Sequence, residues 1–572
     1  MTGRGHVRIA SHTAVSSSPS RPGDFYSDRR RGTLPAGGVV GLSMLRPTPS
    51  GTWLPSYIPE STSTLSVLLL LCSVAQSTTG GYDGSMLNGL NMLPSYADYF
   101  GLTSATRGLN TASIFIGGFF GPVAGGVMSD SLGRRPALFW ASVITVAGVA
   151  LQTAARNVAM FVVGRIVLGF GGGISYVAAP VYLSETFSSR WRPWGVGVCI
   201  PRPRPPVEAP GSTLADARPK LLNNFYYVGA LVAAGVTLAT GRWDSTWAWR
   251  CPSLLQSVFS LVCVLVLPFV PESPRWLVRQ DRYEDARLVV AQTNADGDVA
   301  DPVASAVYRE ILDTLEREKK RARAMSPVEI ARNPVARRRV LVGASAGPFS
   351  CVAGNVIASY YLGSELTTAG VTSPSDQLKA NVVLNVWCLA CCLAGTQLAA
   401  SWGRKSTALV SQALLTACLF VIGGLSKMYA DDPGGAPQSL VYGDVAVMFL
   451  FQGFYSVAWT PLLPLYPPEV MDYPTRANGV ALSAFTSNGL AMLLVFVMPI
   501  GLDTIGWRMY MIKGSWDVIT FLLIAVFWVE TKGKTLEEMD AIFEPEKQPR
   551  SSVPAVEDAR PRPGGGREQD EV

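Results

Sequence analysis

One acidic residue lies near the end of a long apolar segment, where Asp83 interrupts the run "TTGGYDGSML". A charged group at the centre of a bilayer costs about 2.5–3.5 kcal/mol on insertion scales, so this carboxylate needs a partner or a wet cavity. A later apolar segment, "VVGRIVLGFGGG", carries one basic residue, Arg165. A carboxyl group beside an arginine stays ionised, whereas one that is desolvated and separated from it takes up a proton. The two residues therefore predict either a switchable proton site or a static ion pair.

A second set of charged residues lies at the ends of apolar segments. Glu185 precedes Arg192 by seven positions, and Glu469 precedes Arg476 by the same seven. Ordinary topogenic charge explains the arginines but not the matched glutamates, so we expect ion pairs that hold neighbouring helix ends together and break as a protein changes conformation. The candidate gate residues are Asp130, Arg134, Arg135, Glu185, Arg192, Glu272, Arg404, Glu469 and Arg476.

The elements that must position these residues are long apolar runs. The chain has 572 residues, of which 48% are hydrophobic and 16% are charged, and about 20 weakly charged residues suffice to span a bilayer as a helix. We therefore predict an all-α membrane protein with twelve transmembrane helices. The predicted spans are Leu65–Leu90, Leu109–Ser129, Ala137–Ala155, Val158–Val181, Leu221–Thr240, Ser253–Val270, Val340–Leu362, Ala380–Ala400, Thr407–Leu425, Val441–Leu465, Val480–Gly501 and Met509–Val529.

Basic residues orient these spans. The loops after the second, fourth, eighth and tenth spans carry Lys or Arg, and the long loop after the sixth contains "EREKKRARA" and "ARRR". By the positive-inside rule these loops face the cytoplasm, as do both termini. The net charge of +6 reflects this topology, and we do not interpret it as nucleic-acid binding.

The two halves of the chain resemble each other. "GGVMSDSLGRRPAL" has a counterpart in "GTQLAASWGRKSTAL", and "PVYLSETFSSRWR" has one in "PLYPPEVMDYPTR". Such a parallel repeat predicts two six-helix halves with the substrate site between them. The predicted parts are a disordered cytoplasmic tail over 1–60, a first half over 61–270, a linker over 271–339, a second half over 340–530 and a cytoplasmic tail over 531–572. Ala400 occupies the place of Asp130, so we expect a weaker gate in the second half.

Five motifs in order make the resemblance specific. "GYDG", "D-x-x-G-R-R", "P-x-Y-x-S-E…R", "PESPRWL" and "ETKGKTLEEMD" recur in the sugar porter family of the major facilitator superfamily, and here they extend over residues 60–545. "SYYL" and "TPLLPLYPPE" most resemble the fungal lactose permease-like or hexose transporter-like branch. The resemblance implies that Asp83 pairs with Arg165 and couples sugar movement to protons, because uniporters of the family tend to have a neutral residue at this position.

The chain departs from the family pattern at the positions that contact the sugar in hexose carriers. The glutamine pair that hexose carriers have in the seventh helix is replaced by Ser350 and Cys351, and their tenth-helix tryptophan is replaced by Pro464. Amides and aromatic faces suit hydroxyl-rich ligands, although the amides would equally serve interhelical hydrogen bonding. The candidates for substrate binding are Asn223, Asn355, Tyr360, Tyr361 and Trp459.

Residues 198–220 do not fit the family pattern. The family leaves about eight positions between the arginine after the fourth helix and the amide of the fifth, whereas Arg192 and Asn223 are 31 apart. The segment contains six prolines and cannot continue a helix. It is either a tolerated cytoplasmic loop or the translation of a retained intron, and we favour the intron because the segment falls at the expected start of the fifth helix.

The most consistent prediction is a secondary transporter of a sugar or polyol, driven by proton symport, in the plasma membrane. The alternatives are a facilitative uniporter, a membrane sugar sensor, or an inactive product of a faulty gene model. The sequence predicts no enzyme, cofactor, metal site or nucleic-acid partner: Cys388, Cys391 and Cys392 lie on an apolar helix without His or carboxylate nearby, and "GFGGG" (Gly169–Gly173) suits close helix packing better than nucleotide binding.

Overall fold

The structure of the protein is a computed structural model. It describes residues 42–44, 57–59, 61–187, 225–321, 327–355, 359–431, 437–471, 473–532, 539 and 542–543. The 198–220 segment, Arg192 and Asn223 lie outside the described residues, as does most of both tails.

The helices of the first half coincide with the first six apolar runs. They are α1 (Thr62–Asn91), α2 (Pro94–Phe100), α3 (Ser104–Ser131), α4 (Arg134–Thr153), α5 (Val158–Thr186), α7 (Phe225–Thr240), α8 (Trp247–Leu255), α9 (Ser257–Val266) and the 3₁₀ turn η3 (Leu267–Phe269). Side-chain caps mark several starts: Ser61 accepts from the Thr64 amide, and Asn157 accepts from the Met160 amide.

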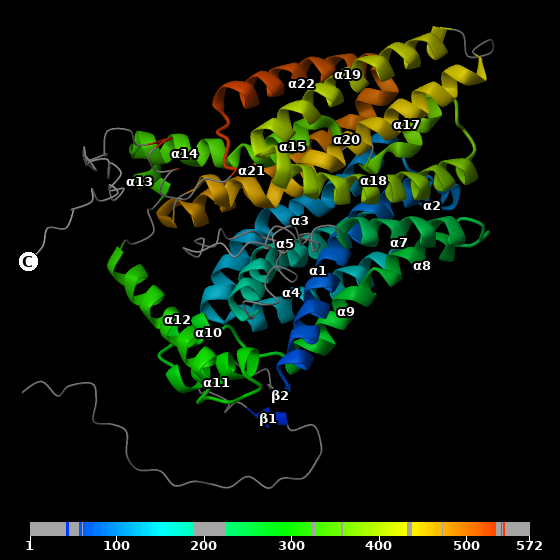
Figure 1. The fold of residues 1–572 in the computed structure, drawn as a ribbon. Coiled ribbons are helices and arrows are strands. Elements are labelled where there is room, and N and C mark those ends of the chain that lie inside the picture. The colour runs from blue at the N-terminus through cyan, green and yellow to red at the C-terminus, as the bar shows by residue number, and fades with distance from the viewer. Residues whose placement is uncertain are drawn as a thin grey trace, which may run out of the picture. The chain divides into compact units, whose positions relative to one another are not determined.

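The linker is helical. It consists of α10 (Pro274–Arg279), α11 (Tyr283–Asn294), α12 (Pro302–Arg321) and α13 (Pro327–Arg332). The first three of these helices share a small apolar core of their own around Trp276, Val289 and Ile311. This core places α10, α11 and α12 as a compact group at one end of the first half, beside the start of α1, whereas α13 packs against α14 (Figure 1).

The second half repeats the plan of the first. Its helices are α14 (Pro334–Ala344), α15 (Ala346–Ser350), the π turn η4 (Cys351–Asn355), α17 (Leu362–Thr368), α18 (Pro374–Trp402), α19 (Arg404–Asp431), α20 (Gln438–Val470), α21 (Tyr473–Ile505) and α22 (Arg508–Phe527). The seventh span therefore begins at Pro334, six residues before its predicted start, and it is broken where Gly354 adopts a φ of 109°.

Ten of the described helices are long and apolar enough to cross a membrane, which makes the chain a multi-pass integral membrane protein. The fifth predicted span corresponds to α7, a shorter apolar helix of 16 residues whose predicted start lies outside the described residues. The seventh is divided among α14, α15, η4 and α17. Ten of the twelve predicted spans therefore correspond to helices long enough to cross a membrane, and the described parts of the fifth and seventh correspond to shorter helices.

Close helix contacts hold each half together. α3 and α4 pack against α5 and α1 packs against α7, while α18 and α19 pack against α20. A Cβ at Gly169 would lie 2.0 Å from the carbonyl oxygen of Ile114, so only glycine permits this approach of α5 to α3. This confirms the packing interpretation of "GFGGG". The two halves meet where α3 contacts α21 and α7 contacts α18 (Figure 1).

The N-terminal tail contains structure that the prediction of disorder over 1–60 missed. β1 (Leu42–Met44) pairs antiparallel with β2 (Tyr57–Pro59). Ile58 is fully buried in an apolar cluster with Leu65 and Leu69 of α1, which explains why these strands form.

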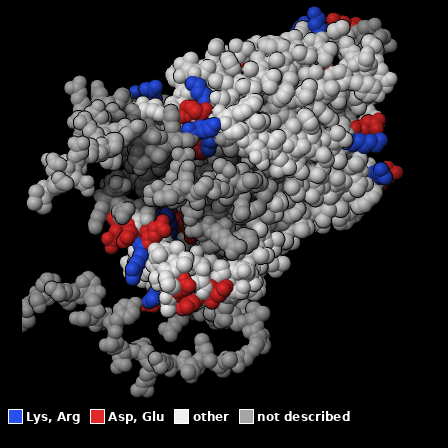
Figure 2. Space-filling view, in the orientation of Figure 1, with Lys and Arg blue, Asp and Glu red and all other residues white. Residues whose placement is uncertain are grey.

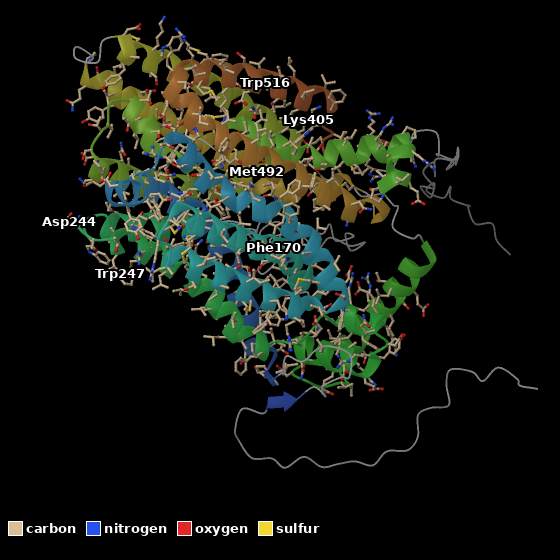
Figure 3. The ribbon with its side chains drawn as sticks, turned by 180° about the vertical axis from the view of Figure 1, so that it is seen from behind. Phe170, Asp244, Trp247, Lys405, Met492 and Trp516 are labelled. Carbon is tan, nitrogen blue, oxygen red and sulfur yellow. The ribbon has the colours of Figure 1, made fainter. Side chains whose placement is uncertain are left out.

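Charged side chains are unevenly distributed over the described surface. Figure 2 shows Lys, Arg, Asp and Glu at the two ends of the helices and a broad face between them without charge. Figure 3 places Asp244 and Trp247, at the turn into α8, at one end and Lys405, at the start of α19, toward the other. Exposed apolar residues such as Phe120 and Leu493 lie near the middle of α3 and α21, as expected of a surface that faces lipid.

Candidate functional site

A polar cavity lies where helices of both halves meet. Its volume is about 40 Å³, which gives room for a few water molecules. The first half contributes α1 and α7, and the second half contributes η4, α18 and α20. The cavity is lined by Gly84, Ser85, Asn88, Tyr226, Tyr227, Ala230, Asn355, Ser359, Asn381, Leu384, Asn385, Cys388 and Gln452.

Amides dominate the polar lining. Asn88 Nδ2 donates to Asn381 Oδ1 at 3.2 Å, which connects α1 to α18. Asn355 Oδ1 accepts from Gln452 Nε2 at 2.6 Å and from Ser359 Oγ at 2.7 Å. Gln452 Oε1 and Asn381 Nδ2 have no hydrogen-bond partner among the described residues. One acceptor and one donor therefore remain for a hydroxyl-bearing ligand.

A hydroxyl contact also connects the halves. Tyr227 of α7 shares a hydrogen bond of 2.7 Å with Ser456 Oγ of α20. Together with the Asn88–Asn381 bond, it connects the two halves beside the cavity.

Asp83 lies directly behind this cavity, one residue before Gly84. Its side chain is buried, and Oδ1 accepts a short hydrogen bond from the amide of Gln256, between α8 and α9. Gln256 in turn accepts from Gln152 Nε2 at 3.5 Å. A neutral amide therefore satisfies the carboxyl group.

Arg165 is completely buried on α5, and none of its three guanidinium nitrogens has a hydrogen-bond partner among the described residues. It interacts electrostatically with Asp83, Tyr96 and Tyr360, but it forms no ion pair with Asp83. The predicted direct contact is therefore wrong for this conformation, because Gln256 takes the place at the carboxylate. An unpaired buried guanidinium is costly.

The first predicted gate is assembled at the ends of α3, α4 and α5 that lie nearest the linker. Arg134 Nε lies 3.2 Å from Glu185 Oε2, and Arg134 Nη1 lies 3.1 Å from Asp130 Oδ1. Ser273 Oγ donates a short hydrogen bond to the same Glu185 oxygen. Arg135 donates to the carbonyl of Val270 at 2.9 Å instead of reaching the gate carboxylate.

The second gate has the same plan. Arg404 binds Glu469 through two hydrogen bonds, of 2.9 Å from Nη2 and 3.0 Å from Nε. Thr531 Oγ1 donates to Glu469 at 2.6 Å, in the role that Ser273 has in the first gate. Arg476 donates to the Met471 carbonyl at 3.3 Å. The expected weakness of this gate is not apparent in its geometry, because the bidentate pair compensates for the residue that replaces Asp130.

A capping glutamate completes each gate. Glu272 accepts backbone hydrogen bonds from Arg134 and Arg135 at the start of α4, and Glu530 accepts them from Arg404 and Lys405 at the start of α19. A carboxylate satisfies the free N–H groups of a helix start and complements its dipole. Sequence reasoning missed Glu530, although its place in "ETKGKTLEEMD" was visible.

The two caps differ in their electrostatics. Burial raises the pKa of Glu272, and neither the Arg135 charge nor the backbone hydrogen bonds reverse this. Burial also acts to raise the pKa of Glu530, but that residue is less enclosed, and hydrogen bonds from the backbone of Lys532, Arg404, Ser406 and Lys405 lower its pKa overall.

Only one of the described residues predicted to bind substrate lines the cavity. Asn355 lines the cavity. Tyr361 donates to the Val495 carbonyl at 2.7 Å, and Trp459 packs edge-on against Trp528, so both belong to the core outside the cavity lining. Tyr360 packs against Phe115 and is not in the lining. The amides Asn88, Asn381 and Gln452 were missed, although single amides within apolar runs are a visible signal.

Comparison with known proteins identifies the family. The sequence profile of the family described as "Sugar (and other) transporter" matches residues 69–198 and 214–543. The chain belongs to this family. It is therefore a sugar porter of the major facilitator superfamily, a transporter and not an enzyme. The interruption of the match, over 199–213, falls inside the proline-rich 198–220 segment.

Three relatives illustrate the range of the family. The chain is 28% identical to the MFS-type transporter criB of Aspergillus cristatus, over 83% of this chain and 94% of that protein. It is 28% identical to a high-affinity glucose transporter of Kluyveromyces lactis, over 81% and 82% of the two chains. It is 27% identical to the sugar transporter STL1 of Saccharomyces cerevisiae, over 77% and 73%.

Solved structures show the same fold. The inward-open xylose transporter XylE of E. coli matches with a TM-score of 0.63 and 21% identity, over 84% of this chain and 99% of that one. The proton:xylose symporter XylE bound to 6-bromo-6-deoxy-D-glucose matches with a TM-score of 0.62, over 84% and 100%. These likenesses confirm the two-bundle architecture of the superfamily.

Proposed function

We propose that the protein transports a sugar or related polyol across the plasma membrane by alternating access. The cavity between the halves supports this, because ligands of this fold bind near the midplane between the repeats. Gln452 Oε1 and Asn381 Nδ2 are free to bind hydroxyls, and Asn355 is held beside them. The relatives named as glucose and sugar transporters support the substrate class.

The proposed driving force is proton symport through Asp83 and Arg165. The observation that carries this proposal is that both side chains are buried and interact electrostatically without pairing. A carboxyl group that rests on a neutral amide is suited to hold a proton. If α1 and α5 shift within the first half during alternating access and bring Arg165 to Asp83, the carboxyl group becomes an ion-pair partner and releases that proton.

The proposed orientation places both termini and the linker in the cytoplasm. The two gates lie at the helix ends nearest the linker, and the linker end carries the exposed basic residues Arg337 and Arg338. In this orientation the Arg134–Glu185 and Arg404–Glu469 pairs each hold helix ends of one half together on the cytoplasmic side. We expect these pairs to rearrange as the halves rock.

Uptake of a panel of radiolabelled sugars and polyols, in a host that lacks its own transporters, tests this function. We expect at least one compound to accumulate above its external concentration, and a protonophore to abolish the accumulation. Uptake that only equilibrates, unchanged by the protonophore, would show a uniporter. Uptake of no compound by a chain that reaches the membrane would refute sugar transport.

A further inference from the structure

The second half contains a cluster of ionisable side chains that the proposed mechanism does not use. Lys513 and Asp517 lie four residues apart on α22, Glu365 lies on α17 and Asp444 lies on α20. All four are at least nine-tenths buried: 5% of Lys513, 0% of Asp517, 4% of Glu365 and 1% of Asp444 is exposed. Lys513 interacts electrostatically with Asp517 and Glu365, and Glu365 does so with Asp444.

The hydrogen bonding of this cluster is incomplete. Lys513 Nζ and Glu365 Oε2 have no hydrogen-bond partner among the described residues, and the Asp517 carboxylate has only the side-chain amide of Gln412 beside it. Asp444 Oδ2 accepts from Ser426 at 2.8 Å, but Oδ1 has no such partner. The other titratable groups near the cluster are Tyr510 and Cys351.

The charge of the cluster does not balance. Three carboxylates and one ammonium group would leave two uncompensated negative charges in the membrane interior if all were ionised, and buried charges of that kind neutralise instead. A metal ion is not favoured as the compensating group, because no three His, Cys, Asp or Glu side chains of the described chain come together closely enough to hold one. We propose that Glu365, Asp444, Lys513 and Asp517 form a second proton-binding site.

The position of the cluster relates it to the break in the seventh span. A Cβ at Gly354 would lie 3.3 Å from Lys513 Nζ, so the lysine lies directly against the π turn η4. The next residue, Asn355, lines the cavity, and Glu365 lies on α17 beyond the break. Proton binding at the cluster therefore favours the docking of α17 against its neighbours α18 and α19. Loss of the proton leaves repelling carboxylates that favour the release of α17.

The cluster lies toward the membrane face opposite the gates, since α17 precedes the turn into α18 and α18 ends beside the gate residue Arg404. A site that exchanges protons with that face alone transports none. It adjusts the stability of the docked conformation to the pH of that face, separately from coupling at Asp83.

The test is the pH dependence of thermal unfolding of the full-length protein in detergent, without sugar, so that it does not depend on the proposed substrate. All variants carry Asp83→Asn, which removes the proton site of the first half. We expect the unfolding temperature of the Asp83→Asn protein to fall by about 3 °C or more as the pH rises from about 6 to about 8.

Adding Glu365→Gln should remove most of this fall, because the variant can no longer ionise there. Adding Asp376→Asn should leave it unchanged, because Asp376 forms an exposed ion pair with Lys379 at the start of α18. If Glu365→Gln does not fold, Asp517→Asn is expected to have the same flattening effect. A flat profile for the Asp83→Asn protein, or a slope that neither Glu365→Gln nor Asp517→Asn reduces, would overturn the proposal.

Discussion

The two halves of the molecule share their gates and differ in their interiors. In both, a glycine with positive φ precedes the gate arginine: Gly133 has a φ of 111° and Gly403 a φ of 103°. In both, a glutamate caps the helix that follows. The interior of the first half holds one acid and one arginine that do not pair, whereas the interior of the second half holds three acids and one lysine.

This difference distinguishes residues with a structural role from residues with ionisable side chains in the interior. The repeated residues satisfy backbone groups and hold helix ends, which any rocking bundle needs on both sides. We propose that the ionisable chemistry belongs to residues that are not repeated: Asp83 and Arg165 in one half and the Lys513 cluster in the other. We therefore expect changes at matched gate positions to have matched effects, and changes in the interior to have different ones.

The gates provide the comparison with the largest expected effect on stability. Arg404→Met leaves Glu469 without its bidentate partner and should destabilise the protein by about 3 kcal/mol. Arg134→Met should cost less, because part of the Arg134 interaction goes to Asp130, whose side chain is 76% exposed. Thermal unfolding of both variants in detergent measures this order. Equal losses would show that the Asp130 contact contributes as much as the bidentate geometry.

Substitution of a residue that lines the cavity should change the affinity for sugar and leave the stability of the fold unchanged. Asn355→Ala removes the acceptor that orients Gln452 and should weaken sugar affinity about tenfold, corresponding to one or two hydrogen bonds. Asn294→Ala, in the linker helix α11, serves as the control and should leave affinity unchanged. Equilibrium binding of the transported sugar to both purified variants decides this, and an unchanged affinity for Asn355→Ala would remove that residue from the site.

Changes at the capping glutamates Glu530 and Glu272 should have the smallest effect on stability, and the two effects should depend on pH in opposite directions. The lowered pKa of Glu530 means that its carboxylate stabilises the fold above its unfolded pKa, and that this stability is lost as the pH falls through the folded value. The raised pKa of Glu272 means that its contribution is greatest in acid and is lost as the pH rises through the folded value.

Glu530→Gln should therefore cost about 1 kcal/mol at neutral pH, and its difference from the unchanged protein should shrink toward about pH 4. The difference in stability between Glu272→Gln and the unchanged protein should instead shrink as the pH rises. Unfolding temperatures over this pH range provide the measurement. Parallel profiles for the two variants would show that the caps are electrostatically equivalent.

Much of the fold was predictable from the sequence because its signals are local. Apolar runs of membrane-spanning length located the ten membrane-spanning helices of the described chain, and the repeated "GR" and "E" motifs located the gate pairs. The break at Gly354 was not predictable, because a glycine in an apolar run is compatible with a continuous helix. The pairing of β2 with β1 depends on Ile58 finding a distant apolar cluster, which no local pattern indicates.

The candidate site was predicted less completely. Asp83 and Arg165 were visible as charges in apolar runs, but the contact between Asp83 and Gln256 joins residues 173 positions apart. The amides of α18 and α20 become a cavity lining only when α1 and α7 face them. The second ionisable cluster was missed for the same reason, since Glu365 and Lys513 lie on separate helices.

The most direct test of the account is the simultaneous measurement of sugar and proton uptake in proteoliposomes containing the full-length protein. The account predicts that sugar entry carries protons with it, and that Asp83→Asn eliminates proton entry and uphill accumulation while sugar still binds. Sugar-driven proton entry that is undiminished in Asp83→Asn would contradict it.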